Sequence, residues 1–156
     1  MAWPNNAGPV TIGAYGTGTG PDVLGIYDNA PRITVTGGTF LDLSFKQDWR
    51  IMDLRLVDAT RSYGSFGGVS DMQRLLFYRL KIEGFGVALG WSHWNESSLM
   101  RIDDMVIVSS AISDSNNNIV YVGSERLALL GNIIRDAQQS HVVRVWQAYR
   151  LSLIHI

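Results

Sequence analysis

Two short segments of this sequence combine aromatic rings with groups that bind sugars or exchange protons. The first, from Trp91 to Glu96, contains Trp91, His93, Trp94 and Glu96 in one polar stretch. Indole faces stack on sugar rings, and His or Glu side chains act as general acids and bases. The alternative interpretation is structural: Trp91 ends an inward-facing strand, and Trp94 covers the edge of a coil.

The second segment alternates valines with an arginine and a tryptophan, from Val143 to Trp146. On a strand, this alternation places Arg144 and Trp146 on one face and the valines on the other. A guanidinium binds a carboxylate through two parallel hydrogen bonds, and an indole offers a stacking plane, so the pair suits an acidic sugar. The structural alternative is an ion pair between Arg144 and a neighbouring coil, for example with Asp136, beside a surface tryptophan.

The adjacent carboxylates Asp103 and Asp104 are a weaker candidate for chemistry. Paired carboxylates act as acid and base in glycosidases at separations of about 5–9.5 Å. Neighbouring residues on a flat strand point to opposite faces, so this pair would have to lie in a bend, and we interpret it as a solvated turn. No catalytic residue, cofactor or metal site is therefore predicted, and nothing in the sequence motivates a calcium site.

The composition excludes several functional classes. The 156 residues suffice for one buried core, and a content of 46% hydrophobic and 17% charged residues excludes general disorder. The net charge of −1 lacks the basic excess typical of nucleic-acid binding, so no nucleic-acid partner is predicted. No apolar run approaches 18 residues, so no membrane-spanning helix is predicted. There is no cysteine, which excludes disulfides, and Met1–Gly8 lacks the features of a signal peptide.

Short apolar runs separated by glycines and turn residues indicate β-strands that must position these groups. An arginine followed by Ile or Leu recurs at intervals of 24, 27, 25 and 24 residues, at Arg50, Arg74, Arg101, Arg126 and Arg150. This period is too short for a propeller blade, and a β-sandwich does not keep such a register. The pattern predicts an all-β, right-handed parallel β-helix with about 24–27 residues per coil and strands stacked about 4.8 Å apart. The segment Arg61–Asp71 predicts a long loop that either walls a groove or merely connects coils.

The repeat also predicts which positions stack in neighbouring coils. The residues after four of the arginines should form one inward column: Ile51, Leu75, Ile102 and Leu127. The fourth positions should form a second aliphatic column: Leu54, Tyr78, Met105, Leu130 and Ile154. Asn132 interrupts a third column, either because it lies at a bend and bonds its amide along the stack or because the register slips there. The arginines should point outward and pair with acidic residues such as Asp48, Asp71, Asp103 or Glu125, since stacked like charges repel.

Two parts of the chain carry a resemblance to a known superfamily. They are Gly8–Gly18 and Glu125–Ile156, the latter with Asn-Ile-Ile-Arg-Asp at 132–136 and His-Val-Val-Arg-Val-Trp at 141–146. They resemble coils of right-handed β-helix proteins of the pectate-lyase-like superfamily. The resemblance implies an extracellular or cell-surface protein that binds or acts on an acidic polysaccharide, as a polysaccharide lyase or a glycosidase. It equally implies the alternative of a non-catalytic shaft of a phage tailspike or surface adhesin, because no catalytic signature of the superfamily is present.

The end of the sequence predicts an incomplete domain. The hexapeptide Leu151–Ile156 stops within a coil and resembles a translated sequencing adapter, although Leu151, Ile154 and Ile156 fit the repeat. We interpret residues 1–156 as part of a β-helix domain that is open at its C-terminal end, where unpaired strand edges favour self-association. Because 53 residues separate Trp91 from Arg144, about two coils, the two aromatic segments would line one groove if they share a face.

Overall fold

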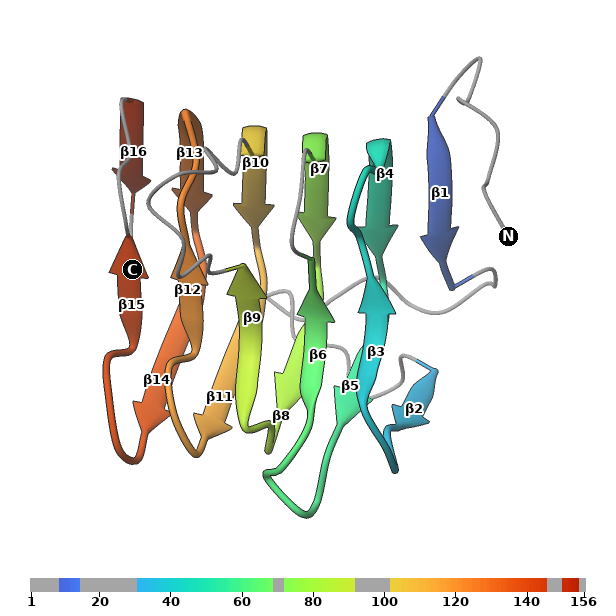
Figure 1. Ribbon diagram of the computed structural model, residues 1–156, viewed down its shortest axis with the longest axis vertical. Coiled ribbons are helices and arrows are strands. Elements are labelled where there is room, and N and C mark those ends of the chain that lie inside the picture. Colours follow the sequence, from blue (N-terminus) through green and yellow to red (C-terminus); the bar gives the residue numbers. More distant parts are fainter. Residues whose placement is uncertain (1–8, 15–30, 69–71, 92–101, 146–149, 155–156) are drawn as a thin grey trace.

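All regular elements of the described residues are β-strands in the computed structural model. The description covers residues 9–14, 31–68, 72–91, 102–145 and 150–154. The strands form three sheets in which every pairing is parallel, and the chain visits the three sheets in turn with each coil (Figure 1). The predicted right-handed parallel β-helix is therefore confirmed.

Each sheet is a stack of one strand per coil. The first sheet contains β1 (Val10–Gly13), β4 (Gln47–Met52), β7 (Met72–Tyr78), β10 (Ile102–Val108), β13 (Arg126–Leu130) and β16 (Arg150–Ile154). The second contains β2 (Arg32–Thr34), β5 (Arg55–Val57), β8 (Lys81–Glu83), β11 (Ala111–Ser115) and β14 (Ile133–Ala137). The third contains β3 (Thr39–Asp42), β6 (Gly64–Gly67), β9 (Val87–Trp91), β12 (Val120–Val122) and β15 (Val143–Val145).

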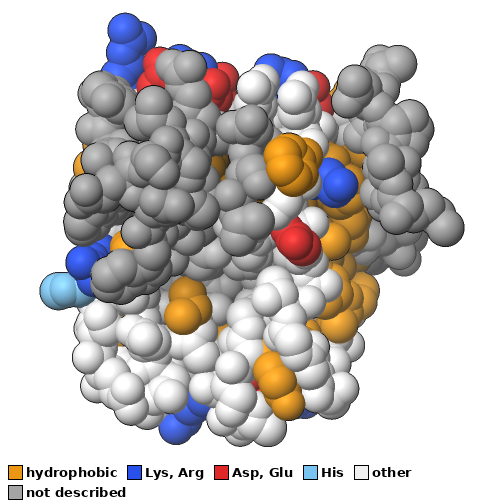
Figure 2. Space-filling view, in the orientation of Figure 1, with side chains coloured by type: hydrophobic (Ala, Val, Ile, Leu, Met, Phe, Trp, Pro, Cys, Tyr) orange, Lys and Arg blue, Asp and Glu red, His pale blue; other side chains and the backbone are white. Residues whose placement is uncertain are grey.

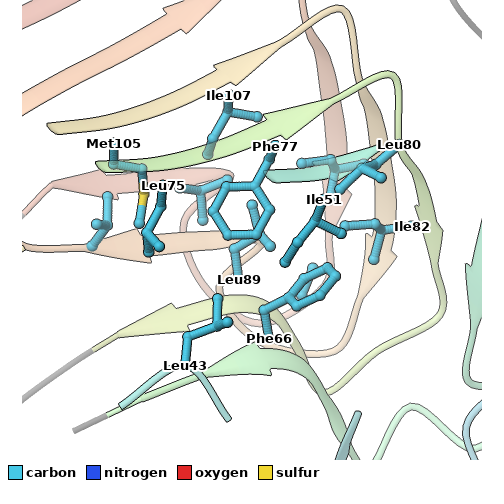
Figure 3. Packing of buried hydrophobic residues seen from close by; sticks show 14 of the residues in the cluster. Leu43, Ile51, Phe66, Leu75, Phe77, Leu80, Ile82, Leu89, Met105 and Ile107 are labelled. Atoms are coloured by element: carbon cyan, nitrogen blue, oxygen red, sulfur yellow. The ribbon is translucent and has the colours of Figure 1, made fainter. Parts of the chain in front are cut away.

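The core fills the space between the three sheets with ladders of apolar side chains (Figure 3). The second sheet contributes Ile33, Leu56, Ile82, Ile112 and Ile134 in one register. In the middle coils, Phe77 of β7 meets Phe66 of β6, with ring centroids 5.2 Å apart. Each such fully buried side chain contributes roughly 1.5–3 kcal/mol to stability, which holds the coils in stack.

The predicted inward column is wrong in register, although its four residues are buried. Leu75 and Leu127 both pair with Met105, but Ile51 pairs with Phe77 and Ile102 pairs with Met72. The physical reason is that the coils differ in length. Equivalent positions are 26 residues apart from Trp49 to Leu75, 30 from Leu75 to Met105, 22 from Met105 to Leu127 and 24 from Leu127 to Leu151. A nearly constant sequence interval therefore does not follow the stack.

The second predicted column is also wrong as an inward ladder. Tyr78, Leu130 and Ile154 do share a register position through Val108, but Met105 lies three residues earlier on β10. Tyr78 and Leu130 are only half-buried and lie outside the core cluster. Their strand ends lead into the corner after the first sheet, so this column marks the exit of the strand rather than the core.

Asn132 lies at that corner and bonds along the stack, which confirms the first of its two interpretations. Its Nδ2 donates to the carbonyl of Ile107 at 2.8 Å, and its Oδ1 accepts from the backbone N–H of Ser110 at 2.9 Å. The Ser110 hydroxyl continues the chain of hydrogen bonds by accepting from the N–H of Leu80 at 3.1 Å. The preceding Gly131 has a φ of 58°, and this left-handed conformation turns the chain towards the second sheet.

Charged side chains of alternating sign follow the outer face of the first sheet. Arg74 Nη2 donates to Asp48 Oδ2 at 2.8 Å, and Arg126 Nη2 donates to Asp104 Oδ2 at 2.9 Å. Arg126 also lies 3.3 Å from Glu125, so the predicted outward pairing of arginines with Asp48 and Glu125 is confirmed. The hydrogen bond from Arg126 is the main cause that lowers the pKa of Asp104 below its usual value.

The interpretation of Asp103 and Asp104 as a solvated turn is wrong. Both residues lie within β10, and their side chains are half-buried. Asp104 has a φ of 61°, which bends the strand locally and directs its carboxylate to the Arg126 side chain. Asp48 and Arg74, its equivalents in two earlier coils, also have positive φ values. The carboxylate of Asp104 therefore serves the cross-coil ion pairs.

Candidate functional site

A groove with a volume of about 630 Å³ opens on the outer face of the third sheet. Its lining comes from four coils: Thr39, Arg61, Ser62, Tyr63, Gly64, Phe66, Gly67, Gly86, Val87, Gly90, Asn116, Asn117, Tyr121 and Gln139. Figure 2 shows this face of the molecule, and its lower part consists mainly of neutral polar side chains and backbone. Arg61 is the one charged side chain in this lining, as far as the described residues go.

One wall of the groove is the loop from Asp58 to Tyr63, which a buried carboxylate holds in shape. Asp58 accepts hydrogen bonds from the backbone N–H groups of Thr60, Ser62 and Tyr63 at 2.8–2.9 Å, and from the Thr60 hydroxyl at 2.6 Å. Burial alone would raise the pKa of Asp58, but these hydrogen bonds outweigh it and lower the pKa below its usual value. An Asp side chain that bonds N–H groups further along the chain substitutes for backbone turn contacts, which fixes Tyr63 at the groove.

The rim above this loop continues from coil to coil through backbone hydrogen bonds. Gly86 N donates to the carbonyl of Tyr63 at 2.8 Å, Asn117 N to the carbonyl of Gly86 at 2.9 Å, and Gln139 N to the carbonyl of Asn116 at 3.1 Å. A Cβ atom on Gly86 would lie 3.1 Å from the Ser62 carbonyl, so glycine allows the close approach of the loop. The rim is therefore a rigid stack that presents one or two polar residues per coil.

Arg61 contributes little free charge to the groove. Its Nη2 donates to Asp114 Oδ2 at 2.8 Å, across two coils, and Gln138 Nε2 donates to the other oxygen of Asp114 at 3.3 Å. The carboxylate of Asp114 thus compensates the guanidinium of Arg61. The lining of the groove is close to neutral, which favours neutral hydrogen-bonding partners over a general attraction for anions.

The floor of the groove follows one register position across the third sheet. Asp42 of β3 pairs with Gly67 of β6, Gly67 with Gly90 of β9, Gly90 with Tyr121 of β12, and Tyr121 with Arg144 of β15. The guanidinium carbon of Arg144 lies 5.2 Å from the centroid of the Tyr121 ring, a cation–π contact. Bare backbone at two glycines is therefore continued by an aromatic ring with a cation beside it.

Several polar groups of the lining are available to a ligand. Within the described part of the chain, no hydrogen bond is made by the hydroxyls of Tyr63 and Tyr121 or by the side-chain amides of Asn116 and Gln139. Hydroxyl and amide groups donate and accept hydrogen bonds, as sugar hydroxyls do. Among the described lining residues no carboxylate is present, so the groove can bind and orient a ligand but assembles no acid–base pair there.

The structure describes only part of the site residues that the sequence predicts. Arg144 is exposed on β15, whereas Val143 and Val145 pack against the core, as their alternation predicts. Trp91 ends β9 and pairs with Val122, so its backbone lies beside the Gly90 position of the groove floor. The Trp91 side chain and the whole of His93, Trp94, Glu96 and Trp146 lie outside the described residues. Their role in binding stays a prediction.

The residues that sequence reasoning missed come mainly from corners of the coil. Tyr121 and the amides of Asn116 and Gln139 reach the groove because corners from different coils stack, which no local pattern reveals. The predicted loop Arg61–Asp71 is partly wrong, because Gly64–Gly67 forms strand β6. Its first residues do wall the groove, and the signal for this was the run of turn-forming residues after Asp58.

No protein family, curated protein or solved structure matches this chain. Within the described ranges, no helix is long and apolar enough to cross a membrane. The same ranges contain no group of three or more His, Asp or Glu side chains placed to hold a metal ion. The functional argument therefore depends on the groove itself.

Proposed function

We propose that this β-helix binds a polysaccharide in the groove of the third sheet, with a preference for an acidic chain. The observation that carries the proposal is the groove floor, where bare backbone at Gly67 and Gly90 leads to the ring of Tyr121 with Arg144 beside it. Aromatic rings stack on the apolar faces of sugars, and the available hydroxyls and amides of the rim match sugar hydroxyls. An extended groove across several coils suits a chain rather than a compact small molecule.

The preference for an acidic chain rests on the Arg144 side chain. The groove lining is otherwise close to neutral, because Asp114 compensates Arg61. A guanidinium held against an aromatic ring keeps a defined position and can bind the carboxylate of a uronic acid through two hydrogen bonds. Stacking on Tyr121 and the ion pair with Arg144 would then act on the same sugar residue.

This function agrees with the resemblance to pectate-lyase-like proteins and with an extracellular or cell-surface location, both of which stay proposals. The lining favours binding over catalysis, because its described residues include no carboxylate. If the protein cleaves its ligand as a lyase or glycosidase, the catalytic groups come from outside this lining. The alternative is a non-catalytic shaft of a tailspike or adhesin, which requires no sugar binding at the groove.

Retardation in native gels that contain pectate, alginate or a neutral glucan tests the proposed binding. The wild-type protein should be retarded by at least one of these polymers, and Tyr121→Ala should reduce that retardation for acidic and neutral chains alike. The Tyr121 side chain lies on the outer face of β12, so its removal should leave the thermal unfolding temperature nearly unchanged. Absence of retardation by every polymer would favour the shaft alternative.

Replacement of Arg144 by alanine should weaken binding of pectate and alginate selectively. The expected loss is about 1–3 kcal/mol for a charge-assisted hydrogen bond, with little change for the neutral glucan. Arg135→Ala is the matched control, since Arg135 is an exposed arginine on the second sheet that pairs with Asp136. Binding should be measured at two salt concentrations, because the ionic contribution is screened by salt. Equal losses for Arg144→Ala and Arg135→Ala would exclude a specific role of Arg144.

A further inference from the structure

The groove floor has a shape that bears on which polysaccharides it accepts. At Gly67 and Gly90, neighbouring positions of β6 and β9, the outer face of the third sheet carries no side chain. Thr39 flanks this strip on one side and Tyr121 on the other, and all four residues line the groove. The strands of a parallel sheet are about 4.8 Å apart, so the strip from Gly67 to Tyr121 extends about 10 Å along the helix axis.

A sugar chain that stacks on Tyr121 and continues along the axis would lie directly on the backbone of β9 and β6. The strand backbone at this point is fixed on both sides by parallel pairing, with β9 between β6 and β12. A substituent on the inward edge of a sugar ring would meet this backbone, which cannot rotate away as a side chain can. An unsubstituted ring, by contrast, finds the depth that the absent side chains leave.

We propose that the groove selects linear polysaccharides whose rings carry no bulky substituent towards the sheet, and that Gly67 and Gly90 determine this specificity. The inference rests on the proposed polysaccharide binding and adds the substrate class: an unbranched chain that runs along the helix axis. The glycines act as specificity-determining positions through the space they leave, while Tyr121 and Arg144 supply the attractive contacts.

Gly67→Ala tests the proposal with little disturbance of the fold. A Cβ atom at this position would lie 3.4 Å from Thr39 Cγ2 and 3.6 Å from the carbonyl oxygen of Gly90, both ordinary contact distances. Gly90→Ala is less suitable, because its Cβ would lie 2.8 Å from Val87 Cγ1. Gly37→Ala is the matched control, since Gly37 is exposed, lies outside the groove and leaves its Cβ in open space.

Binding of Gly67→Ala to the linear polymer that retards the wild type should be weaker by about fivefold or more, the effect of one added methyl group in a closely packed contact. The thermal unfolding temperatures of Gly67→Ala and Gly37→Ala should match that of the wild type, and Gly37→Ala should bind normally. In a second comparison, the wild type should bind pectate more tightly than acetylated pectin, and linear mannan more tightly than galactose-branched mannan.

The outcomes separate this inference from the proposed function. If the wild type binds a polymer and Tyr121→Ala weakens it, but Gly67→Ala binds normally, the specificity role of the glycines is wrong and the binding function stands. Equal affinity of the wild type for linear and substituted chains overturns the inference in the same way. If no polymer binds the wild type, the proposed function fails, and the inference fails with it.

Discussion

Replacement of Phe77 by alanine is expected to lower the free energy of unfolding by about 3–5 kcal/mol. Phe77 is fully buried in the middle coil, between Ile51 and Ile107 in its own ladder and against the Phe66 ring of the third sheet (Figure 3). The loss has two causes, the removed transfer free energy of the ring and the cavity left behind. The ladders on either side hold the coils at strand spacing, so they cannot close around a cavity of that size.

Leu76→Ala on the same strand is the control for this prediction. Leu76 is half-buried and lies at the register position of Arg50 and Val106, on the opposite face of β7 from Phe77. Its truncation removes a comparable number of apolar atoms without opening a cavity between the sheets, so the loss should be much smaller. Urea unfolding followed by circular dichroism measures both variants. Equal destabilisation by the two substitutions would mean that the inward and outward faces of β7 are assigned wrongly.

The β-helix could be predicted from the sequence because its core imposes one strong requirement. Each coil must supply apolar residues to three sheets, so strands and turns recur along the chain, as with Ile33, Leu56 and Ile82. The exact register could not be predicted in the same way, because it depends on how many residues each corner consumes. The loop held by Asp58 and the segment between Trp91 and Ile102 change the coil length without changing the core.

The candidate site divides along the same lines. The alternation of Val143, Arg144 and Val145 is local, so the outward direction of Arg144 follows from it directly. The contact of Arg144 with Tyr121 depends instead on the pairing of β15 with β12, which joins residues 23 positions apart. The bare backbone of the groove floor requires glycines from two coils in one register, and a single glycine in a strand carries no such information. Sequence periodicity therefore predicts which way a side chain faces, while the register decides its neighbours.

Replacement of Asp58 by alanine should both destabilise the protein and weaken polysaccharide binding. The substitution leaves the N–H groups of Thr60, Ser62 and Tyr63 without their acceptor, at an expected cost of about 3 kcal/mol or more for a buried charged acceptor. Because the same loop carries Arg61 and Tyr63 to the groove wall, binding should fall although no direct contact to the ligand is removed. Asp136→Asn, at an exposed carboxylate, should change neither property.

The pH dependence of stability identifies the carboxylate as the cause. The pKa of Asp58 is lower in the folded protein than the value of about 3.9 for an unperturbed Asp, so the unfolded chain takes up the proton first on acidification. The stabilisation from Asp58 is therefore fully present above about pH 4 and is lost as the pH falls through the folded-state pKa. Asp58→Asn keeps the shape of the side chain but removes this titration, so its unfolding free energy should fall less steeply between about pH 5 and pH 2 than that of the wild type. If the two profiles run parallel over that range, the carboxylate of Asp58 does not hold the groove loop by its charge, and the wall of the binding site depends on the neutral contacts of the corner instead.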